Sequence, residues 1–117
     1  GTTTAGAAGI ADTHFDLSRA GSRRGSMFGL GLYFAESSMK SDEYAEADSD
    51  GRCPLLLCRV LCGNIYHTTR GGNYARVCDK RKDCYHSCLG DREQAQGTYR
   101  EFVVFDEHQI YPEYIVW

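Results

Sequence analysis

The stretch that most constrains the fold of this chain is residues 27–44, MFGLGLYFAESSMKSDEY. Its glycines let the backbone approach a ligand or a second strand closely. The apolar run around them predicts a short strand at residues 32–35. Serines follow, so we expect a helix that begins at Ser37 or Ser38, since serine caps helix N-termini well. A strand that leads from such glycines into a capped helix predicts the floor of a ligand pocket.

The same stretch supplies residue types that can hold a flat polar ring. Ser37, Ser41 and Tyr44 stand at i, i+4 and i+7, so they share one face of the expected helix. Tyr33 lies on the preceding strand, and two aromatic rings beside a hydroxyl can sandwich and orient a ligand ring. A cationic ring would gain roughly 0.5–2 kcal/mol more from cation–π attraction. The alternative is that both tyrosines are ordinary core residues.

The clearest strand in the sequence covers residues 98–106, TYREFVVFD. Glu101 shares one face with Val103 and Phe105, and both faces become apolar beyond it. We therefore expect Glu101 at the border between solvent and core. The alternative is a strand-end carboxylate paired with Arg100 or with a loop lysine, because a buried acid without partners is costly.

The hydrophobic pattern assigns the remaining segments. The run PLLLCRVLCG at 54–63 is apolar except for Arg59 and predicts a buried strand, with 65–67 as its continuation after a turn. Pro112 favours an edge position for a last strand at 110–117. The other expected elements are a helix at 2–13, a lid-like polar loop at 15–26, an acidic loop at 45–52, a long polar loop at 68–83, a short strand at 85–89 and a loop at 90–97. Strands mixed with short helices in this order predict an α+β fold.

Length and charge narrow the function classes. The 117 residues favour one domain, 1–117, and the net charge of −3 argues against a general nucleic-acid-binding chain. Basic clusters at Arg19, Arg23 and Arg24 and at residues 80–82 could meet an anion locally, although such runs are more often solvated loop faces. No apolar run approaches the roughly 20 residues of a membrane helix, and no secretory segment is visible, so we expect no membrane partner.

Six cysteines are present, and we expect them to be free thiols. Without a secretory segment, buried thiols in a reducing compartment are the better interpretation, which predicts an intracellular protein of the nucleus or cytoplasm. One run, C-x5-C-x-H-x-C, contains the ligand types of zinc and is formed by Cys78, Cys84, His86 and Cys88. Its spacing differs from that of the usual zinc knuckle, so we expect no metal site, with a zinc-stabilised interaction domain as the alternative.

Three blocks of the sequence carry a specific resemblance: MFGLGLYFAESSMKSDEY, PLLLCRVLCGNIY and YREFVVFDEHQIYPEYIVW. In this order and spacing they resemble the catalytic domain of poly(ADP-ribose) polymerases, and among these the tankyrase-like members. The resemblance implies the ADP-ribosyltransferase fold, with two packed, mostly antiparallel sheets and a few short helices around a NAD cleft. It also implies transfer of ADP-ribose from NAD to a protein acceptor or a growing poly(ADP-ribose) chain, with release of nicotinamide. The alternative is a non-catalytic module that recognises NAD or ADP-ribose.

The resemblance further implies roles for individual residues. The family's catalytic trio is His, Tyr and Glu; Tyr33 and Glu101 match its Tyr and Glu. The His of the family's H-G-T motif would stand just upstream of Gly1, so we expect an N-terminally incomplete domain with weak activity by itself. The loop at 15–26 resembles the one that covers NAD. The family's motifs assign NAD binding to Gly1, Thr2, Gly9, Tyr33, Ser41 and Tyr44, and assign no metal ligand.

Overall fold

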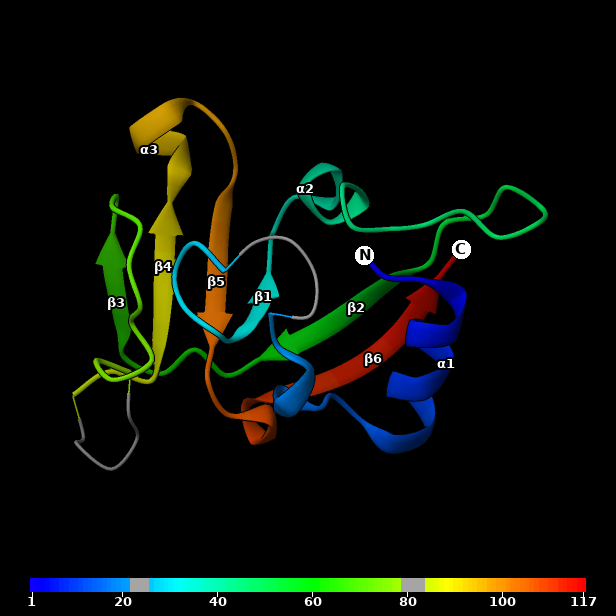
Figure 1. Cartoon of the computed structure of the whole chain (residues 1–117), viewed down its shortest axis with the longest axis horizontal. Helices are drawn as coiled ribbons and strands as arrows, with labels where there is room; N and C mark the ends of the chain where they lie inside the picture. The colour runs from blue at the N-terminus through cyan, green and yellow to red at the C-terminus, as the bar shows by residue number, and fades with distance from the viewer. Residues whose placement is uncertain (22–25, 79–83) are drawn as a thin grey trace.

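Two β-sheets and a few short helices make up the part of the molecule that the structure describes. The computed structural model of the chain describes residues 1–21, 26–78 and 84–117. The larger sheet has four strands, in the order β1 (Leu32–Phe34), β5 (Arg100–Val104), β4 (Ser87–Asp91) and β3 (Ile65–Thr68). The smaller sheet pairs β2 (Leu55–Val60) with β6 (Ile110–Val116). Figure 1 shows the two sheets next to each other.

Antiparallel pairing dominates both sheets. β5 pairs with β1 on one side and with β4 on the other, and β2 pairs with β6, all antiparallel. β3 runs parallel to β4, since Ile65 lies opposite Ser87 and Thr68 lies opposite Gly90. These sheets, together with the short helices, confirm the expected α+β class.

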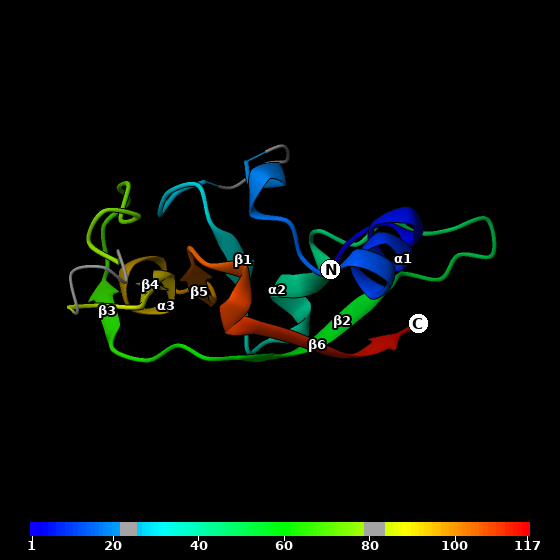
Figure 2. The same ribbon diagram turned by 90° about the horizontal axis from the view of Figure 1, so that it is seen from below.

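The helices are short and lie around the sheets. α1 (Thr4–Thr13) begins where the Thr3 hydroxyl accepts a hydrogen bond of 2.9 Å from the Gly6 N–H. Figure 2 shows α1 on one side of the β2–β6 pair. Within the described ranges, no helix combines the length and the apolar character that crossing a bilayer requires. The other helical segments are α2 (Ser38–Asp42), α3 (Arg92–Gln96) and the 3-10 turns η1 (Leu17–Arg19) and η3 (Glu107–Gln109).

The hydrophobic core lies against the larger sheet. Phe28 and Val103 are fully buried, and with Cys78 and Cys88 they form its centre. Gly90 on β4 makes room for the Phe28 ring, because a Cβ at this position would lie 2.1 Å from the ring atom Cε2. The glycine-containing stretch therefore anchors itself by inserting one aromatic ring against a glycine of the sheet.

Most of the expected elements are confirmed. The helix expected at 2–13 is α1, and the strands expected at 32–35, 98–106 and 110–117 are β1, β5 and β6. Pro112 lies on a strand with a single partner, next to a register shift between Leu57 and Cys58, as expected for proline in a sheet. Ser37 does precede α2, although its side chain makes no capping hydrogen bond. Arg23, Arg24, the basic run at 80–82 and parts of the two polar loops lie outside the described residues.

The prediction of a buried strand at 54–63 is wrong in its burial. β2 forms there, but Leu57 and Leu61 are 55% and 63% exposed. The reason is that the sheet has two strands and α1 lies on only one of its sides. Residues 65–67 do not continue β2 either, because β3 crosses to the larger sheet and pairs with β4.

The prediction of a loop at 90–97 is also wrong. Gly90 and Asp91 end β4, and the next five residues form α3. The Asp91 carboxylate caps this helix by accepting from the Gln94 N–H, and Gly97 ends it at a φ of 67°. A helix this short shows no periodic pattern, but Asp and Gly at its two ends are the residues that favour a helix start and stop.

Candidate active site

The residues that the sequence predicts for a ligand pocket line one cleft. This cleft has a volume of about 240 Å³. Its walls come from the N-terminal residues, β1, α2 with the turn that follows it, and β5. The predicted residues among its lining are Gly1, Thr2, Tyr33, Ser41, Tyr44 and Glu101.

Strand pairing places Tyr33 and Glu101 on the same face of the larger sheet. Tyr33 lies opposite Val103, and Glu101 precedes Val103 by two residues, so the side chains point to one side. Glu101 is only 5% exposed, which corrects the expectation that it lies at the border of the core. Two basic side chains lie beside it, Lys40 from α2 and Arg92 from α3.

The hydroxyl of Tyr33 forms hydrogen bonds with the backbone of the loop that precedes β1. It accepts a hydrogen bond of 2.9 Å from the Phe28 N–H and donates one of 2.8 Å to the Gly29 carbonyl. Burial raises the pKa of Tyr33 to about 12, so the hydroxyl stays protonated at neutral pH. Tyr33 can therefore offer its ring to a ligand, while its hydroxyl stabilises the turn before β1.

Gly1 lies directly against α2. A Cβ at this position would stand 1.9 Å from the Ser41 carbonyl oxygen, so only glycine fits there without a shift of the backbone. Thr2 holds the segment in place, because its N–H donates to the Pro54 carbonyl at 3.3 Å and its carbonyl accepts from the Glu46 N–H at 3.1 Å. Gly1 and Ser41, both predicted to bind NAD, are thus neighbours in space.

Lys40 is a cleft residue that the sequence analysis missed. Its Nζ lies 2.7 Å from Glu43 Oε2, 3.7 Å from Glu101 Oε1 and 5.3 Å from the centre of the Tyr44 ring. Burial lowers the pKa of Lys40, but the hydrogen bond to Glu43 and the charge of Glu101 outweigh burial and raise it overall. The side chain is therefore a cation inside the cleft. Its spacing of three from Glu43 and four from Tyr44 was the available signal.

Gly9, unlike the other predicted residues, does not line the 240 Å³ cleft. It lines an adjoining, larger cleft of about 690 Å³ between α1, β1 and β2, which shares Gly1, Thr2, Tyr33 and Ser41 with the smaller one. A Cβ at Gly9 would meet nothing within 4 Å, so the packing does not require a glycine here. Arg19, from the basic cluster noted in the sequence, lines both clefts.

Cys53, Cys58, Cys62, Cys78 and Cys88 are free thiols, and of these only Cys78 and Cys88 are buried. Both lie in the hydrophobic core, where burial raises the pKa of Cys78 to about 11 and that of Cys88 to about 12. His86 is directed elsewhere, since its Nδ1 accepts a hydrogen bond of 2.9 Å from the Asn64 N–H. In the part of the chain that the structure describes, no three His, Cys, Asp or Glu side chains form a metal-binding group.

The sequence of this chain is similar to those of known ADP-ribosyltransferases. A sequence model of the poly(ADP-ribose) polymerase catalytic domain matches residues 1–98. The human protein mono-ADP-ribosyltransferase PARP12 is 31% identical over 97 residues, and poly [ADP-ribose] polymerase 1 of Caenorhabditis elegans is 31% identical over 122 aligned residues. Each alignment covers 79% of this chain and 13% of the relative, so the chain spans a small part of these proteins. Glu101 lies beyond the family match, and its place in the cleft is known from the structure.

Proposed function

The chain belongs to the poly(ADP-ribose) polymerase catalytic-domain family, and we propose that it transfers ADP-ribose from NAD to a protein acceptor or a growing poly(ADP-ribose) chain, releasing nicotinamide. The observation that carries the proposal is the convergence of six predicted residues on one cleft, with a buried carboxylate, Glu101, in its wall. In this proposal residues 1–117 belong to one catalytic domain.

The aromatic part of the cleft suits the leaving group of the reaction. The nicotinamide ring of NAD is flat and cationic, and the rings of Tyr33 and Tyr44 both line the cleft. The Ser41 hydroxyl and the backbone of Gly1, which lies against the Ser41 backbone, would hold the carboxamide. Fixing the ring in this way removes rotational freedom before the glycosidic bond breaks, which can supply several kcal/mol of barrier lowering.

Glu101 suits the charge that develops on the sugar. When nicotinamide leaves, the ribose becomes oxocarbenium-like, as a sugar does in glycoside hydrolysis. A carboxylate beside the ribose places a fixed negative charge where positive charge appears, and it can accept a hydrogen bond from a ribose hydroxyl. Because Glu101 is buried, this interaction is weakened little by water. The acceptor nucleophile would approach the same ribose carbon after departure of nicotinamide.

Nicotinamide release from NAD by the full-length protein tests the proposal. The wild type should release nicotinamide and transfer ADP-ribose, and Glu101→Gln should reduce both by about 10²- to 10³-fold, the loss typical of removing one transition-state contact. Titration calorimetry should give the same affinity for NAD in both proteins, since the amide is nearly isosteric.

Two outcomes would contradict the transferase proposal. A wild type that binds NAD without releasing nicotinamide would identify a recognition module. A Glu101→Gln variant with unchanged transfer would remove the role given to Glu101.

A further inference from the structure

Glu101 lies between two cations that reach it from different sides of β5. Lys40 Nζ is 3.7 Å from Oε1, and Arg92 Nη1 is 3.9 Å from Oε2. Figures 1 and 2 both show β5 between α3, which carries Arg92, and α2, which carries Lys40. Lys40 lines the 240 Å³ cleft, whereas Arg92 lines neither of the two clefts described above. Arg92 therefore contacts the carboxylate from behind the cleft wall.

The two cations differ in the number of carboxylates that lie within 4.0 Å of them in the described residues. Lys40 is closer to Glu43, at 2.7 Å, than to Glu101, so its charge is divided. Arg92 has no carboxylate other than Glu101 within 4.0 Å across the described ranges. Its Nη2 donates instead to the neutral Oε1 of Gln96 at 3.0 Å, which fixes the plane of the guanidinium. Arg92 is thus the cation dedicated to Glu101.

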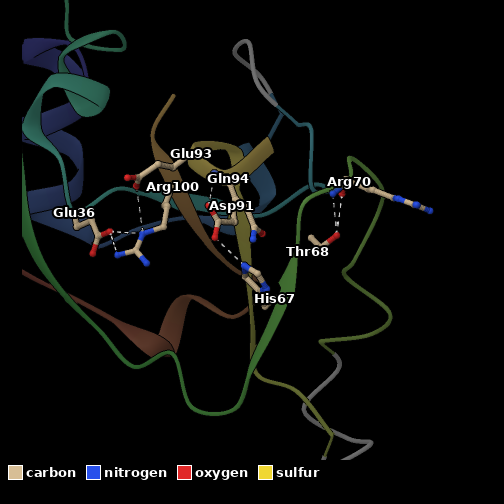
Figure 3. A network of polar contacts seen from close by, with 8 residues as sticks. All are labelled: Glu36, His67, Thr68, Arg70, Asp91, Glu93, Gln94 and Arg100. Atoms are coloured by element: carbon tan, nitrogen blue, oxygen red, sulfur yellow. Dashed lines mark hydrogen bonds and ion pairs between the residues drawn. The ribbon is translucent and has the colours of Figure 1, made fainter. Parts of the chain in front are cut away.

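α3 holds Arg92 in place at both ends of the helix. At its start, the Asp91 carboxylate accepts a hydrogen bond of 3.0 Å from the Gln94 N–H and contacts His67 Nε2 at 2.9 Å, as Figure 3 shows. At the other end, the Arg92 carbonyl accepts from the N–H groups of Gly97 and Thr98. The side chain thus projects from a short helix with a fixed start and stop.

The surroundings of Arg92 indicate that packing alone does not account for its position. Its Nε is buried and has no hydrogen-bond partner in the residues that the structure describes. A buried donor without a partner destabilises a folded protein. Arg92 nevertheless occupies this position, and the carboxylate that its guanidinium faces there is the buried Glu101.

We propose that Arg92 is a positioning residue, which holds the Glu101 carboxylate in the orientation that faces the cleft. The inference rests on the proposed function, because it gives Arg92 a part in ADP-ribosyl transfer. Arg92 acts through Glu101 and makes no contact with NAD. Its loss should therefore reduce the rate of turnover, while the affinity for NAD, set by the cleft residues, stays the same.

The test is steady-state kinetics of nicotinamide release by the full-length protein and its variants. Arg92→Met, which keeps the length of the side chain without its charge, should lower kcat about 10- to 100-fold with an unchanged KM for NAD, because a small misplacement of a reacting group costs about that much. Arg92→Lys should recover most of the loss. Glu93→Gln, an exposed position of the same helix, is the matched control and should keep the wild-type kcat.

The outcomes separate this inference from the proposed function. A wild type without turnover overturns the proposed function and this inference with it. An active wild type with an equally active Arg92→Met variant overturns only the positioning role, as does a variant whose KM rises while kcat is kept. Where Arg92→Met does not fold, as judged by its thermal unfolding, Arg92→Gln takes its place, and a kcat equal to that of the wild type has the same meaning.

Discussion

The two sheets use similar apolar residues in different surroundings. In the larger sheet, Val103 and Val104 are fully buried, and Glu101 is buried beside them. In the smaller sheet, Leu57 and Tyr114 stand opposite each other and are 55% and 65% exposed. The two sheets differ in exposure because different segments of the chain cover their faces. The apolar pattern of a single strand does not predict which segments will cover it. The carboxylate proposed for catalysis belongs to the covered sheet, where a low dielectric strengthens its interactions.

Truncation of Phe28 should have the largest effect on stability. Phe28 is fully buried against Gly90, so Phe28→Ala leaves a cavity and should lower the free energy of unfolding by about 3–5 kcal/mol. The matched change in the smaller sheet is Tyr111→Ala, at a position that is 62% exposed, and it should cost far less. Urea unfolding followed by circular dichroism measures both. Equal losses would show that the two sheets are covered to the same degree.

Loss of Lys40 should have the next largest effect. Lys40→Met removes a cation from two carboxylates, one of them buried, and should destabilise the fold by about 2 kcal/mol, less than a fully broken buried pair because Arg92 still faces Glu101. Glu43→Gln removes the exposed partner of the same lysine and should cost less than about 1 kcal/mol. Thermal unfolding of the two variants checks the order. A larger loss of stability in Glu43→Gln would mean that Lys40 stabilises the fold mainly through Glu43 and not through Glu101.

Acid pH should destabilise the larger sheet by protonating Asp91. Hydrogen bonding from the Gln94 N–H, followed by contact with His67, lowers the pKa of Asp91 below its ordinary value of 3.8. Folding therefore favours the ionised carboxylate. The resulting stability is present above pH 3.8 and is lost as the pH falls through the lower pKa of the folded state.

Asp91→Asn isolates this charge, because asparagine also caps helices well. The variant should show a weaker loss of melting temperature between about pH 5 and pH 2 than the wild type. The control is Asp48→Asn, in the loop before β2, where hydrogen bonding from the Arg52 N–H also lowers the pKa. Both variants should reduce the loss of stability at acid pH. Only Asp91→Asn should also reduce nicotinamide release, because it weakens the contact of residue 91 with His67 at the start of α3, the helix that carries Arg92. If only Asp48→Asn reduced nicotinamide release, the link between α3 and turnover would be contradicted.

The sequence predicted much of this fold where the signal was local. Tyr33, Ser41 and Tyr44 lie within twelve residues of one another, so their spacing alone places them near one pocket. Glu101 was predictable as a special carboxylate, because both faces of its strand become apolar beyond it. The structure brings these residues to one cleft, while their individual roles remain predictions.

The rest depended on contacts between distant segments. Charged residues are usually exposed, so nothing local marked Lys40 and Arg92 as partners of one buried carboxylate. Their approach follows from the pairing of β5 with β1 and β4, which sets α2 and α3 around Glu101. α3 itself is too short for periodicity. The exposure of β2 was missed because the apolar run looks the same whether a sheet is covered on one face or on both.

The smallest expected effect is that of Leu57→Ala on the exposed face of the smaller sheet. Leu57 is 55% exposed, so most of its apolar area stays in water on folding and its removal leaves no closed cavity. In the 117-residue chain, the change should alter the free energy of unfolding by less than about 0.5 kcal/mol, as surface substitutions usually do. Leu56, half-buried on the opposite face of β2, is the matched position, and Leu56→Ala should cost more. If Leu57→Ala were the more damaging of the two, the outer face would be covered in solution, and the contrast between the sheets would not hold.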